Sequence, residues 1–141
     1  MTTSRMQERP RRGRTAIALI SGFMVGLILS LGTDQILHAL KIYPPWGETM
    51  SDRLFALASA YRIVYTVIGA YVAARLAPYR PMWHAMLLGW IGFVISLIGA
   101  AVTWNTQPPV GPHWYAVAVA VISLLCAWSG GKLREMQLRT T

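Results

Sequence analysis

Four long apolar stretches separated by short polar segments dominate the pattern of the chain. Each stretch is long enough for a membrane-spanning helix, which needs about 20 residues to cross roughly 30 Å of hydrocarbon. We therefore predict an all-α integral membrane protein built as a four-helix antiparallel bundle. The expected boundaries are a basic tail at 1–14, spans at 15–40, 52–77, 82–104 and 113–131, loops at 41–51 and 105–112, a turn at 78–81, and a second tail at 132–141.

Proline and glycine residues indicate where these helices end. Proline lacks a backbone N–H and constrains the residue before it, so Pro44 and Pro78 are expected to follow the ends of the first and second helices. Pro112 suits the first turn of the fourth helix. Gly130–Gly131 is expected to end that helix.

The composition supports a membrane protein, with 55% hydrophobic and 13% charged residues. The formal charge of +8 could suggest a nucleic-acid partner, but the arginines lie at the ends of apolar runs and form no stripe on one helix face, so no nucleic acid is expected. A single cysteine, Cys126, excludes an intrachain disulfide and a Cys-based zinc site. The first apolar run, from Thr15 to Thr33, is longer than the core of a signal peptide and is interpreted as a retained anchor.

The distribution of lysine and arginine predicts which side each segment faces, because cytoplasmic flanks of spans are enriched in positive charge. The opposite, outer side has Lys41 and Arg53, which Glu48 and Asp52 offset. Both termini are therefore expected in the cytoplasm. The basic residues assigned to that side are Arg5, Arg9, Arg11, Arg12, Arg14, Arg75, Arg80, Lys132, Arg134 and Arg139.

Small residues recur on one face of each predicted span. In lipid, helices associate where small side chains let their backbones approach closely. The same faces could instead contact a second copy or a larger membrane complex, and the sequence leaves this open. The residues assigned to helix packing are Gly22, Gly26, Gly69, Ala73, Gly92 and Ser96.

A candidate ligand or ion site centres on Arg62, which lies in the second span, roughly 12 Å below its outer edge. A charge at that depth is costly and requires a partner. Asp34 is the expected counter-ion, and His38 shares its helix face. The candidate site is the set Asp34, His38, Arg62 and Tyr65, and the alternative is that Asp34 and Arg62 form a structural ion pair that locks the first two helices together. His84 is expected to lie at the membrane interface without a chemical role, and no spacing of histidines supports a metal site.

The chain resembles a group of small, uncharacterised bacterial inner-membrane proteins. The resemblance covers most of the chain from Thr33 onward, and the shared segments are DQILHAL, YPPWG, AYR, GAYVAARLAP, RPMWHA and GPHWY. It implies a bacterial origin and four spans, and brings no activity or catalytic residue. The chain differs from small multidrug exporters, which rely on a glutamate embedded in the first span.

These observations favour a small non-enzymatic membrane protein with a structural or accessory role, which needs the lipid bilayer and no cofactor. No HExxH, GxSxG or pair of membrane carboxylates indicates an enzyme. The alternative is a subunit of an oligomeric transporter or channel, in which the polar cluster around Arg62 lines a path for small ions or solutes.

Overall fold

The computed structural model describes residues 3–106 and 109–141, with side chains from Arg12 onward within those ranges. This part of the chain is all-helical, as predicted, and forms four helices: α1 (Thr3–Ala39), α2 (Asp52–Leu76), α3 (Pro81–Thr103) and α4 (His113–Thr140). Each helix contains a segment that is long and apolar enough to cross a membrane. In α1 this segment begins at Arg12.

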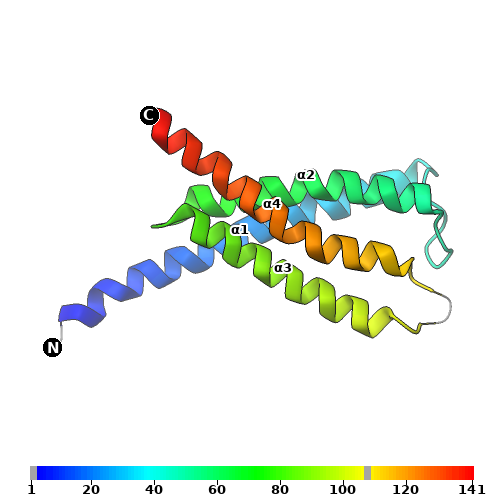
Figure 1. The fold of residues 1–141 in the computed structure, drawn as a ribbon, viewed down its shortest axis with the longest axis horizontal. Coiled ribbons are helices and arrows are strands. Elements are labelled where there is room, and N and C mark those ends of the chain that lie inside the picture. Colours follow the sequence, from blue (N-terminus) through cyan, green and yellow to red (C-terminus); the bar gives the residue numbers. More distant parts are fainter. Residues whose placement is uncertain (1–2, 107–108) are drawn as a thin grey trace.

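The helices run back and forth along the long axis of the molecule (Figure 1). The α1–α2 and α3–α4 connections lie at one end, here called the loop end, whereas both termini and the α2–α3 turn lie at the other, the terminal end. α2 packs extensively against α1 and α4, and α4 packs against α3. α1 touches α3 only slightly, and α3 diverges from α2 toward the loop end in Figure 1.

The expected end of the fourth helix at Gly130–Gly131 is wrong, because α4 continues to Thr140. Both glycines are packing positions. A Cβ at Gly130 would lie 2.6 Å from the carbonyl oxygen of Val67 on α2, and one at Gly131 would lie 2.8 Å from the sulfur of Met82 on α3. The residues after Gly131, KLREMQLRT, mostly have high helix propensity, which allows the helix to continue. Similarly, α1 begins at Thr3, inside the segment that was expected to be a tail.

Small residues fill the interior, and large apolar side chains cover the surface. The exposed fraction reaches 72% for Val102 and 63% for Leu125. Such a distribution suits helices that are surrounded by hydrocarbon, where large apolar side chains need no burial. The buried alanines are Ala18, Ala58, Ala70, Ala73, Ala74, Ala85, Ala100, Ala120 and Ala127.

Gly22 and Gly69 mark the closest approach of α1 and α2. A Cβ at Gly22 would lie 2.5 Å from the carbonyl oxygen of Gly69 and 2.7 Å from the Cβ of Ala73. The other residues assigned to packing lie more loosely: a Cβ at Gly26 would be 3.5 Å from the carbonyl oxygen of Tyr65, and one at Gly92 would be 3.8 Å from the Cβ of Ser123. Gly92, together with Ser96, lines a cavity between the helices.

His84 differs from the expectation of an interfacial residue, because its side chain is fully buried. One ring nitrogen, Nδ1, lies 3.2 Å from the carbonyl oxygen of Arg80, and the other, Nε2, lies 3.2 Å from the hydroxyl of Thr15 on α1. The rings of Tyr79 and Trp83 meet it edge to face. His84 therefore connects α3 to α1 near the terminal end.

Candidate functional site

Arg62 joins three helices through two polar contacts. Its Nη2 lies 2.7 Å from Oδ2 of Asp34 on α1, which forms an ion pair. Its Nη1 donates a hydrogen bond to the hydroxyl of Tyr115 on α4. The predicted pairing of Asp34 with Arg62 is therefore present in the structure, and Tyr115 extends it to a third helix.

The side-chain direction in α2 explains why Arg62 can reach these partners. Side chains on a helix lean toward its N-terminus, which for α2 is the loop end. Asp34 lies five residues before Ala39, the last residue of α1, and Tyr115 lies two residues after His113, the first of α4. At 1.5 Å per residue these positions are about 8 Å and 3 Å from the helix ends. The guanidinium therefore lies closer to the loop end than the backbone that carries it.

Tyrosine hydroxyls extend the polar network away from the ion pair. Tyr61 donates a hydrogen bond to Oδ1 of Asp34, and its hydroxyl lies 3.1 Å from that of Tyr43 in the α1–α2 loop. Both oxygens of the carboxylate thus accept a bond from α2. A chain of polar contacts runs from Tyr43 through Tyr61, Asp34 and Arg62 to Tyr115.

Tyr65 and His38, the other members of the predicted site, lie beside this chain. The Tyr65 hydroxyl is 2.9 Å from that of Thr33, which adds a second contact between α2 and α1. His38 stacks on Trp46 with ring centres 3.9 Å apart, and it meets Tyr43 edge to face. Although His38 shares the helix face of Asp34, the carboxylate oxygens accept from Tyr61 and Arg62, and the imidazole rests on aromatic rings.

Ser59 and Thr66 share the helix face of Arg62, but their hydroxyls turn to their own backbone. Ser59 donates to the carbonyl oxygen of Phe55 at 2.9 Å, and Thr66 donates to that of Arg62 at 2.7 Å. Such bonds to the preceding turn are typical of Ser and Thr in apolar helices. The two hydroxyls thus bond to backbone carbonyl oxygens, and the guanidinium of Arg62 bonds to Asp34 and Tyr115.

Two cavities meet at Arg62. The first, of about 420 Å³, lies toward the loop end and includes Asp34, His38, Trp46 and Tyr115 in its lining. The second, of about 450 Å³, includes residues from Gly22 to Leu31 of α1 and from Leu88 to Ser96 of α3. Three residues line both: Arg62, Ser96 and Val119. α1 and α3 diverge toward the loop end (Figure 1), and both helices contribute to the lining of both cavities.

The two members of the ion pair differ in exposure. The Arg62 side chain is 34% exposed, compared with 11% for that of Asp34. A guanidinium has five N–H donors, and the bonds to Asp34 and Tyr115 use two of them. At the junction of the cavities, the accessible groups are therefore the positively charged N–H donors of Arg62, whereas the Asp34 carboxylate is largely covered.

Three tyrosines belong to the site but not to the predicted set: Tyr43, Tyr61 and Tyr115. Tyr61 directly precedes Arg62 in the sequence, and this adjacency could have placed Tyr61 in the predicted site. Tyr115 is separated from Arg62 by 53 positions, and only the α2–α4 contact brings the two together.

Nothing in the described ranges, 3–106 and 109–141, groups three or more His, Cys, Asp or Glu side chains as a metal site would need. His113 stacks on Trp104 with ring centres 4.0 Å apart, and its Nε2 lies 3.1 Å from the carbonyl oxygen of that tryptophan. Like His38, it is engaged with an aromatic partner at the loop end.

Comparison of the chain with protein-family models, with curated proteins and with solved structures gives no match.

Proposed function

We propose that the chain is a non-enzymatic accessory protein of the bacterial inner membrane, inserted as an antiparallel four-helix bundle with both termini in the cytoplasm. The length and hydropathy of the four helices support insertion. The bacterial origin rests on the resemblance of segments such as DQILHAL and GPHWY to small bacterial membrane proteins. The bilayer is the partner that this proposal requires, and a homo-oligomer or larger complex is compatible with it.

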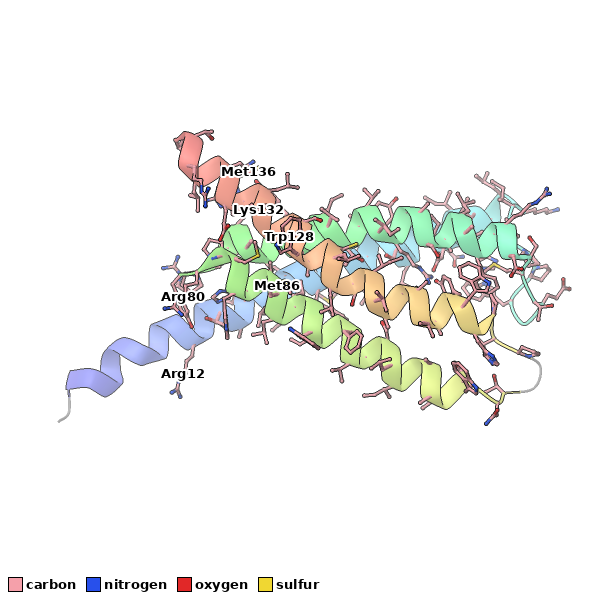
Figure 2. The ribbon with its side chains drawn as sticks, viewed as in Figure 1. Arg12, Arg80, Met86, Trp128, Lys132 and Met136 are labelled. Carbon is pink, nitrogen blue, oxygen red and sulfur yellow. The ribbon has the colours of Figure 1, made fainter. Side chains whose placement is uncertain are left out.

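The orientation rests on the positive charge at the terminal end. Figure 2 shows Arg12 on α1, Arg80 at the start of α3 and Lys132 on α4, all toward the side where the termini lie. At the loop end, the exposed Lys41 and Arg53 are accompanied by the exposed Glu48 and Asp52. Because the cytoplasmic flanks of spans carry the excess of lysine and arginine, the terminal end belongs in the cytoplasm.

Reporters fused to the chain test this topology. Green fluorescent protein fused to either terminus should fluoresce, and alkaline phosphatase fused at Thr141 should be inactive, because the former matures in the cytoplasm and the latter folds outside it. Alkaline phosphatase inserted after Glu48, in the α1–α2 loop, should be active. Opposite compartments for the two termini would contradict the four-span topology.

The accessory role rests on one observation: the charged groups of the Arg62 cluster are used in contacts between helices. The guanidinium of Arg62 on α2 contacts both Asp34 on α1 and Tyr115 on α4, so a single side chain connects three helices. An ion pair of this kind can specify which helices pack together. This arrangement is what a structural role requires.

A second function, in which oligomers conduct small ions or solutes, is favoured by the two cavities that meet at Arg62. Flux through reconstituted vesicles separates the two functions. For an accessory protein, chloride and proton flux should equal that of protein-free vesicles. Flux above this background that Arg62→Gln abolishes, while the protein stays folded and inserted, would replace the accessory role by transport.

A further inference from the structure

The two cavities around Arg62, together called the recess here, share the lining residues Arg62, Ser96 and Val119 and differ in the groups that they add. Toward the loop end, an otherwise mostly apolar lining includes the charged Asp34 and Arg62 and the aromatic His38 and Tyr115. Toward the middle of the helices its lining is mostly apolar, with Phe23, Leu27, Leu88 and Ile95 among the contributors. A recess that is polar at the membrane surface and apolar toward the membrane centre has the shape and polarity of a site for an amphiphile.

The polar end presents a cation. Arg62 is about three times as exposed as the carboxylate that pairs with it, and both oxygens of that carboxylate already accept hydrogen bonds. Donors of the guanidinium beyond the two described bonds can still bind an anionic oxygen. A phosphate group fits this donor geometry, because Arg binds phosphate through two parallel N–H bonds.

The depth of the guanidinium suits a lipid headgroup. Its partners lie about 3 Å and 8 Å from the helix ends, which is near the level where the bilayer surface begins if α1 and α4 span the membrane. A phosphate at this level keeps its place in the headgroup layer. The attached chain then extends toward the centre of the bilayer, in the direction of the apolar cavity.

The apolar cavity is open enough for a chain because α1 and α3 barely touch. Gly26 and Gly92 line it from the two helices, and neither glycine is in close contact: the nearest atom to an added Cβ is 3.5 Å away at Gly26 and 3.8 Å away at Gly92. Van der Waals contact with an inserted chain can therefore replace contact between the helices. An acyl chain is the apolar group that a bilayer supplies at this depth.

We propose that this recess binds one anionic phospholipid, with its phosphate on Arg62 and one acyl chain between α1 and α3. The proposal rests on membrane insertion as stated under the proposed function, and goes beyond an accessory role by assigning a ligand. Binding would place a lipid where α1 and α3 have little direct contact, so that lipid and protein together complete the interior of the bundle.

The test uses the full chain in bilayers that contain equal amounts of phosphatidylglycerol and phosphatidylcholine with identical acyl chains, and a small fraction of oleate. Native mass spectrometry after gentle release in detergent measures which lipid stays bound. We expect a single phosphatidylglycerol to be retained in preference to phosphatidylcholine, because both carry the phosphate but only phosphatidylcholine adds a quaternary ammonium, which the Arg62 cation repels. Arg62→Gln should lower its retention about tenfold, because a hydrogen bond to a charged group is lost.

A second variant keeps the proposal falsifiable if Arg62→Gln unfolds the protein. Gly92→Leu leaves the polar network unchanged and fills the apolar cavity, so it should abolish retention. Gly32→Leu is the matched control, because an added Cβ at this α1 glycine meets nothing within 4 Å and Gly32 does not contribute to either cavity lining. It should retain the lipid as the parent chain does.

Three results would overturn the lipid site: equal retention of the two phospholipids, preferred retention of oleate, or retention that survives Gly92→Leu. The topology reporters distinguish this failure from that of the proposed function. A chain whose reporters show four spans but which retains no phosphatidylglycerol remains an inserted protein without the lipid site. A chain whose reporters show no insertion loses both proposals.

Discussion

Asp34→Asn is expected to destabilise the folded protein by about 3 kcal/mol, because it removes the charge that pairs with Arg62. Breaking a buried ion pair by removing one partner costs roughly 3 to 5 kcal/mol, and the partial exposure of Arg62 places the expected value at the lower end. Asparagine also has only one acceptor oxygen, so it cannot accept from both Tyr61 and Arg62 through separate oxygens as the carboxylate does. Reversible unfolding in mixed micelles of increasing denaturing-detergent content, followed by tryptophan fluorescence, measures the change.

Asp52→Asn is the matched control for this prediction. Asp52 is an exposed acid at the start of α2, where its Oδ1 lies 3.4 Å from the indole nitrogen of Trp114. Its replacement should change stability by less than about 0.5 kcal/mol. The double variant Asp34→Asn with Arg62→Gln should be more stable than the sum of the two single changes predicts, because the second change removes the charge that the first leaves unpaired. Simple additivity would show that the pair does not couple α1 to α2.

Elements of the fold that depend on local pattern could be predicted from the sequence. The four long apolar helices follow from the length of the apolar runs, and proline ends α2 because it cannot continue a helix. The pairing of Asp34 with Arg62 could be predicted as well, because a charge within an apolar helix needs a partner and few candidates exist in this chain. These inferences require no knowledge of which helices meet.

Features that depend on which helices meet could not be predicted. Tyr115 reaches Arg62 only because α2 packs against α4, and a sequence that predicts short connections favours contacts between consecutive helices. The same contact explains Gly130, which has the sequence signature of a helix end but is a packing position against α2. The burial of His84 could not be predicted for the same reason, because it depends on the contact of α3 with Thr15 on α1.

The two cavities could not be predicted from the sequence either. Gly26 and Gly92 were assigned to helix packing, as were Gly22 and Gly69, because all four belong to stripes of small residues. In the structure all four glycines border the second cavity, but only Gly22 and Gly69 also lie against each other, whereas Gly26 and Gly92 have no such close contact. A small residue permits close approach but does not require it. The angle between helices decides which outcome occurs at each position, and that angle depends on the whole interface.

Gly22→Leu is expected to have the second large effect, a loss of about 3 kcal/mol in unfolding free energy, because it separates α1 from α2. The first atom of the new side chain would lie 2.5 Å from the carbonyl oxygen of Gly69 and 2.7 Å from the Cβ of Ala73. Backbone cannot rotate away as a flexible side chain can, so the helices must move apart, which is costly in a packed interface. The loss is measured by the same detergent titration.

Three leucine substitutions on α1 form a graded series that tests this explanation. Gly32→Leu meets open space and should be nearly neutral, Gly26→Leu meets ordinary contact with a nearest atom at 3.5 Å and should have a small effect, and Gly22→Leu should have the largest. Replacing glycine by leucine improves helix propensity equally at all three positions, so the differences report packing alone. Because α1 is held chiefly by α2, loss of this contact should also weaken the coupling between Asp34 and Arg62 in a double-mutant cycle. If Gly22→Leu costs no more than Gly32→Leu, the close approach of α1 and α2 is not what holds the first helix in place.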